Sequence, residues 1–161
     1  MSRDPMDEPR GYASPVCYAH EFDVPPLTLD EVAVRLNDLL EGERAGARGL
    51  IDMKAGRDDE LGRLLDAVAR DEARFCAMLS HHLTRLGYAP SHETGEFYDK
   101  LARREDLDAK LRLLDRGQSA VVRLLDELMP SVDDSRLLAD LREMRDVHVR
   151  NLEKCAAYLA D

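Results

Sequence analysis

The connection that decides the fold of this chain runs from Tyr88 to Glu105 and reads YAPSHETGEFYDKLARRE. It lies in the middle of four segments in which leucine and other apolar residues recur every three or four positions, the spacing of an amphipathic helix. The other connections between these segments are short. A helix of about 25 residues is ~38 Å long, whereas about 18 extended residues span up to ~60 Å. The middle connection can therefore cross the whole length of a helix bundle.

The apolar spacing predicts four long helices and one short helix in the middle connection. The long helices are expected at about 28–54, 59–86, 106–128 and from 131 or 133 to 159, and the short one near Phe97–Arg103. Thr28 and Glu31 form a capping box, in which each side chain accepts a hydrogen bond from the other residue's backbone amide. Gly87 suits the end of the second helix. Pro130 ends the third, and Ser131 or Asp133 is expected to cap the fourth.

The order of short, long and short connections predicts the topology. Short connections make two antiparallel helix pairs, and the long crossover leaves the third helix parallel to the second. We therefore predict an all-α four-helix bundle over 28–161 with the crossover of ferritin-like folds between helices two and three. Residues 1–27 hold five of the seven prolines and no sustained apolar period, so they are expected to form an irregular N-terminal arm. An up-down-up-down bundle with a loose middle loop is the alternative.

Charge and composition exclude several classes of partner. The net charge is −10, and no basic patch is present to neutralise phosphates, so we expect no nucleic acid and no anionic membrane surface as partners. No run approaches 18 apolar residues, and the N-terminus lacks a secretion signal pattern, which predicts a cytoplasmic protein. Three widely spaced cysteines argue against a disulfide framework. A homo-oligomer, most simply a dimer, is compatible with the sequence.

Each long helix carries a polar residue where its apolar spacing points to the core. Because residues near the middle of four packed helices meet at one level, we predict a single buried cluster. Buried carboxylates cost several kcal/mol unless they are paired or bound to a metal. The members of this cluster are expected to be Glu43, Glu72, Gln118, Arg145 and His148.

The same segments resemble the ferritin-like superfamily in its rubrerythrin-type form, over about residues 28–160. The resemblance rests on LLEGERAG (39–46), DEARF (71–75), DRGQ (115–118) and RDVH (145–148), and looks most like an uncharacterised bacterial branch that begins with SPVCY, here 14–18. It implies a pair of iron or manganese ions that handle oxygen, peroxide or stored iron. One Glu from each of two helices and a Glu-x-x-His motif from each of the other two would bind them.

This chain keeps only part of that ligand set. Three of the six expected ligands remain, namely Glu43, Glu72 and His148. Phe75, Gln118 and Arg145 occupy the other three positions. The resemblance therefore implies a reduced, mononuclear site for iron or manganese, with zinc also compatible, and leaves oxidoreductase activity open. Gln118, Arg145 and Cys76 are further candidate members of the cluster.

The alternative is a metal-free bundle that acts as a binding or structural module. In that case Arg145 replaces the metal, because a guanidinium group pairs well with carboxylates. Other ligand-type residues are weaker candidates. Cys17 and His20 are isolated in the arm, and His81 and His82 lie ~15 Å along the helix from Glu72, too far to share its site.

Overall fold

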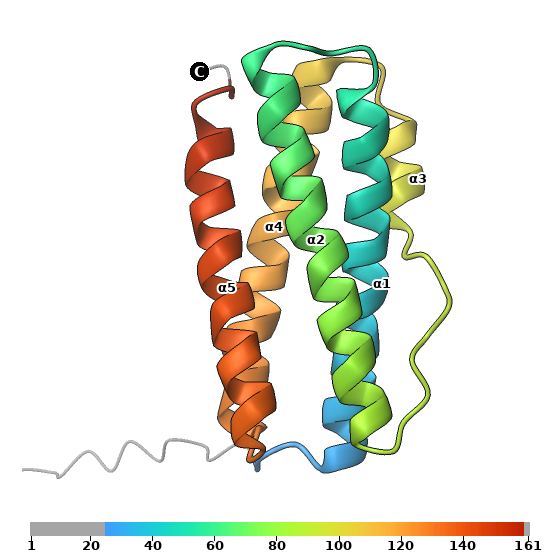
Figure 1. The fold of residues 1–161 in the computed structure, drawn as a ribbon, viewed down its shortest axis with the longest axis vertical. Helices are drawn as coiled ribbons and strands as arrows, with labels where there is room; N and C mark the ends of the chain where they lie inside the picture. The colour runs from blue at the N-terminus through green and yellow to red at the C-terminus, as the bar shows by residue number, and fades with distance from the viewer. Residues whose placement is uncertain (1–24, 160–161) are drawn as a thin grey trace, which may run out of the picture.

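Four long helices run side by side in the computed structural model, which describes residues 25–159 (Figure 1). A short turn joins the first two helices, a 3-10 turn joins the last two, and a short helix lies in the middle connection. The elements are α1 (Leu29–Lys54), α2 (Glu60–Arg85), α3 (Phe97–Ala102), α4 (Leu107–Leu128), η1 (Met129–Ser131) and α5 (Ser135–Ala156). No helix among these residues is both long and apolar enough to cross a membrane. The predicted all-α bundle is confirmed.

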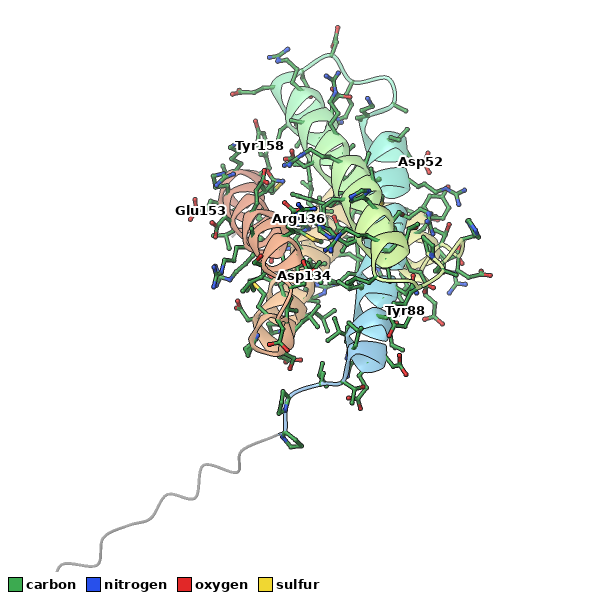
Figure 2. All side chains as sticks on the ribbon, turned by 60° about the horizontal axis from the view of Figure 1, so that its bottom comes forward. Asp52, Tyr88, Asp134, Arg136, Glu153 and Tyr158 are labelled. Carbon is green, nitrogen blue, oxygen red and sulfur yellow. The ribbon has the colours of Figure 1, made fainter. Side chains whose placement is uncertain are left out.

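The crossover has the predicted direction. Figure 1 shows α1 and α5 running one way and α2 and α4 the other, with the chain after α2 returning along the bundle to α3 and the start of α4. Helices α2 and α4 are therefore parallel. Figure 2 shows Tyr88 at the start of this return, where its hydroxyl donates a hydrogen bond to Asp30 of α1. The predicted irregular arm falls almost entirely before residue 25, outside the described residues, and stays a prediction.

Side-chain caps fix the ends of the helices. The Thr28 and Glu31 capping box is present at the start of α1, and Gly87 takes a positive φ of 89° just after α2, a conformation that glycine adopts without strain. The prediction that Ser131 or Asp133 caps the last helix is wrong. Ser131 belongs to the turn that extends α4, whereas the Asp134 carboxylate accepts from the backbone amide of Leu137 and caps α5.

The apolar core is divided into two parts along the bundle. One part is built around Leu36, Phe75 and Leu141, and the other around Leu65, Leu101 and Leu114. Along α1, Glu43 lies between Leu40 of the first part and Leu50 of the second. The polar cluster predicted from the sequence therefore falls where the two apolar regions meet.

Candidate functional site

One polar side chain from each long helix is buried at this level. Glu43 of α1 and His148 of α5 are each 1% exposed, Glu72 of α2 is 2% exposed, and Gln118 of α4 is 6% exposed. Each follows the apolar residues of its own helix at helical spacing, so the same periodicity that buries the leucines buries these side chains. The structure thus brings these four residues together in the middle of the bundle.

Glu43 and His148 form a buried pair. The Nε2 atom of His148 lies 3.1 Å from Oε1 of Glu43, and its Nδ1 atom lies 2.9 Å from the carbonyl oxygen of Met144. A carbonyl only accepts, so Nδ1 carries a hydrogen. Burial lowers the pKa of His148, but the charge and the hydrogen bond of Glu43 outweigh it, and the pKa lies above the usual 6.5. Without a metal ion, an imidazolium that donates to Glu43 is favoured.

Glu72 lies against α1 and α4. Its Oε1 accepts a hydrogen bond from the Gln118 amide. A Cβ atom on Gly46 would lie 2.8 Å from Cδ of Glu72 and closer still to Oε2, so only glycine lets the carboxyl group approach α1 this closely. Burial, together with the negative charge of Glu43, raises the pKa of Glu72 well above its usual value.

Three oxygen atoms of the cluster have no hydrogen-bond partner among the described residues. They are Oε2 of Glu43, Oε2 of Glu72 and Oε1 of Gln118. Their residues line a cavity of 60 Å³ whose wall also includes Gly42, Gly46, Phe97 and Gly117. When both carboxyl groups are ionised, all three free atoms are hydrogen-bond acceptors, so the cavity is then suited to a cation or to a molecule that donates hydrogen bonds.

The helix of the crossover packs on the same region. Phe97 of α3 lies against Gly117, where a Cβ atom would be 2.7 Å from Cε2 of the ring. Leu101 lies against Gly49 of α1 in the same way. These glycines let α3 approach α1 and α4 closely, and Phe97 thereby becomes part of the cavity wall.

Arg145 does not belong to the cluster, and the prediction that it points inward is wrong. Its side chain is 36% exposed and pairs with Asp126 of α4. The buried positions of α5 are Leu137, Leu141, Met144, Val147, His148, Asn151 and Cys155. Residue 145 follows Met144 by one position, which turns it about 100° from the core. The long side chain therefore reaches out to a surface carboxylate on the neighbouring helix.

The cysteines that the structure describes are free thiols outside the cavity wall. Cys76 is half-buried, with its Sγ atom 4.0 Å from the carbonyl oxygen of Leu40. Burial and then the charge of Glu43 raise its pKa to about 12. Cys155 is buried in the core. The other ligand-type pair, Cys17 and His20, lies outside the described residues.

Sequence reasoning missed a second polar network, which joins α2 to α5. His82 is 3% exposed, and its Nε2 lies 2.6 Å from Oδ2 of Asp140. Arg85 donates to Nδ1 of His82 and binds both carboxylate oxygens of Asp134. The sequence signal for the burial of His82 was its position three residues after Leu79, which places both residues on the same face of the helix.

Comparison with known proteins gives a family and a fold. A family model described as "Domain of unknown function (DUF6306)" matches residues 30–157. No curated protein matches the sequence. A solved structure described as that of ferritin like, diiron-carboxylate proteins from Bacillus anthracis str. Ames is similar, with a TM-score of 0.73 and 16% identity over 83% of this chain and 100% of that one. The chain therefore belongs to the DUF6306 family, and it shares the fold of that ferritin-like structure.

Proposed function

We propose that this ferritin-like protein binds one divalent cation of the iron or manganese type, with Glu43, Glu72 and His148 as ligands and Gln118 beside them. The free oxygen atoms of the buried cluster carry this proposal. An unsatisfied buried polar atom costs about 1–3 kcal/mol. Three such acceptors around one cavity favour a ligand that offers positive charge.

Charge balance supports the same reading. Arg145 lies outside the cluster, so among the buried residues of the described chain His148 is the one basic side chain that contacts a carboxylate of the cluster, that of Glu43. A divalent ion bound to both carboxylates, with a neutral imidazole, leaves the site uncharged. Without an ion, the same balance needs a proton on Glu72 and another on His148, in line with their raised pKa values. In the metal-free alternative, protons on Glu72 and His148 therefore balance the charge of the carboxylates, and Arg145 does not.

The donor set fits one ion and not two. Two carboxylates, an amide oxygen and an imidazole suit iron, manganese or zinc, but a dinuclear site of the ferritin-like type uses six side-chain ligands. No three His, Cys, Asp or Glu side chains between residues 25 and 159 are already gathered as a metal site. The imidazole of His148 lies against Glu43 and not in the cavity wall, so binding requires the proposed ligands to move closer together.

The chain's own residues would hold the ion in a buried site. Glu43 and Glu72 supply negative charge from the neighbouring helices α1 and α2, and the Gln118 amide orients the Glu72 carboxylate. The Met144 carbonyl fixes the ring of His148, so that loss of a proton frees Nε2 as a ligand. Bound iron or manganese supplies one-electron redox chemistry, so oxidoreductase activity is the expected use of the site.

Metal content tests the proposal directly. Protein purified without added metal should contain iron or manganese, and chelator-treated protein should bind one Mn²⁺ per chain in a calorimetric titration. Glu72→Gln keeps the shape but removes a charge, and should abolish binding. Glu41→Gln is the matched control, since Glu41 lies on α1 outside the cavity wall and accepts from Ser91. Wild-type protein that contains no metal and binds no Mn²⁺ would reject the proposal and leave a metal-free binding or structural module.

A further inference from the structure

Three glycines lie in the second half of α1, and two of them have a clear steric reason. A Cβ atom on Gly46 would collide with the Glu72 carboxyl group, and one on Gly49 would collide with Leu101. Gly42 differs from both. A Cβ atom there meets no heavy atom within 4 Å. Because glycine destabilises a helix interior relative to alanine, close packing does not explain this residue.

The empty space beside Gly42 adjoins the buried cavity. Gly42 is half-buried and forms part of the cavity wall, next in sequence to Glu43. The same wall includes Glu43, Glu72 and Gln118, each more than nine-tenths buried and each with a free oxygen atom. The absent side chain at position 42 therefore leaves a gap beside the wall that these residues share.

The crossover borders this gap. The backbone amide of Gly95 donates to the carbonyl oxygen of Glu41 at 3.2 Å. Because Glu41 directly precedes Gly42, the chain before α3 lies next to the gap. Phe97 and Val121 complete the cavity wall from α3 and α4. Arg44 holds the crossover by donating to the carbonyl oxygen of Ser91. The gap beside Gly42 is thus bordered by α1 on one side and by the crossover on another.

We propose that Gly42 is the entry to the buried cavity and limits what reaches Glu43 and Glu72 to a small cation or a small hydrogen-bond donor. The cavity of 60 Å³ is large enough for a water molecule, and with Glu43 and Glu72 ionised its free oxygen atoms all accept hydrogen bonds. The inference extends the proposed function, because the ion proposed there would enter here. The inference applies equally if the molecule that enters is a small hydrogen-bond donor and not an ion.

A thiol placed inside the cavity tests the entry without relying on the metal site. Leu114 is 1% exposed and lines the cavity, so Leu114→Cys provides a reporter that a small cation reaches through the opening. Silver(I) serves as the probe, since it is a small cation that binds thiolates. Its uptake is followed by counting the remaining free thiols in denatured aliquots. The same chain without the reporter gives the contribution of the native cysteines, which is subtracted.

Gly42→Leu should block the opening and slow silver uptake by the reporter about tenfold or more. Ala67→Leu adds the same side chain to an exposed position of α2 and should leave the rate unchanged. If Leu114→Cys does not fold, Val121→Cys replaces it as the reporter in the cavity wall. An unchanged rate in Gly42→Leu, or an equal slowing of the native thiols, would overturn the proposal. If wild-type protein binds no Mn²⁺, the proposed function fails while the silver result still decides the entry.

Discussion

Replacing Gly46 by alanine should destabilise the protein, although alanine is the better helix former. The new methyl group would lie 2.8 Å from Cδ of Glu72 and closer to Oε2, so the carboxyl group must move. Overpacking of this kind costs about 1–3 kcal/mol, and loss of the hydrogen bond from Gln118 adds about 1–3 kcal/mol. The gain in helix propensity returns about 1 kcal/mol. We expect a net loss of roughly 1–5 kcal/mol.

Gly42→Ala in the same helix is the matched control. No atom lies within 4 Å of its added methyl group, so this variant should gain ~0.5–1 kcal/mol. Urea unfolding followed by circular dichroism measures both variants, and thermal melts should show shifts of ~2–4 °C for each kcal/mol. If Gly46→Ala equals or exceeds Gly42→Ala in stability, then Glu72 does not need the close approach to α1, and the account of the site is wrong.

Three further outcomes follow from single contacts. Arg145→Glu should leave Mn²⁺ affinity unchanged in calorimetry because this side chain faces Asp126 and not the cavity; tighter binding would place it in the site. The hydrogen bond from Arg85 holds the pKa of Asp134 well below its usual value, so its stabilising effect is full above about pH 4 and declines as the pH falls further. The difference in urea midpoint between wild type and Asp134→Ala should therefore shrink below pH 4, and a constant difference would count against the pairing. Cys76, with a pKa of about 12, should be alkylated at pH 8 roughly 1000-fold more slowly in folded than in denatured protein; equal rates would exclude the burial.

The helices and their connectivity could be predicted because both depend on local information. The Thr28 and Glu31 capping box, the glycine after α2 and the spacing of leucines act within a few residues of the chain. The direction of α4 follows from the length of the 88–105 connection, since a long segment can return along the bundle and a short one cannot. The cap of α5 was misplaced because Ser131, Asp133 and Asp134 are all suitable residues, and only the continuation of α4 through η1 selects Asp134.

The candidate site could be predicted only in part. The four short or planar polar side chains follow the apolar spacing of their helices and meet in the core. Arg145 did not follow its expected direction, because a long side chain at the edge of the buried face can reach solvent and Asp126 at less cost than desolvation in the core. His82 and Asp140 were missed as partners because they are 58 residues apart in the chain.

The sequence by itself determined the helices, their order and the level at which polar side chains enter the core, since these depend on spacing along one chain. Only the tertiary structure decided which polar groups pair, which oxygens stay free and which glycine is needed for packing. Gly42, Gly46 and Gly49 look alike in the sequence. They differ because Glu72 and Leu101 arrive from other elements and occupy the space beside two of them but not the third. Such contacts depend on three-dimensional proximity, which no local pattern encodes.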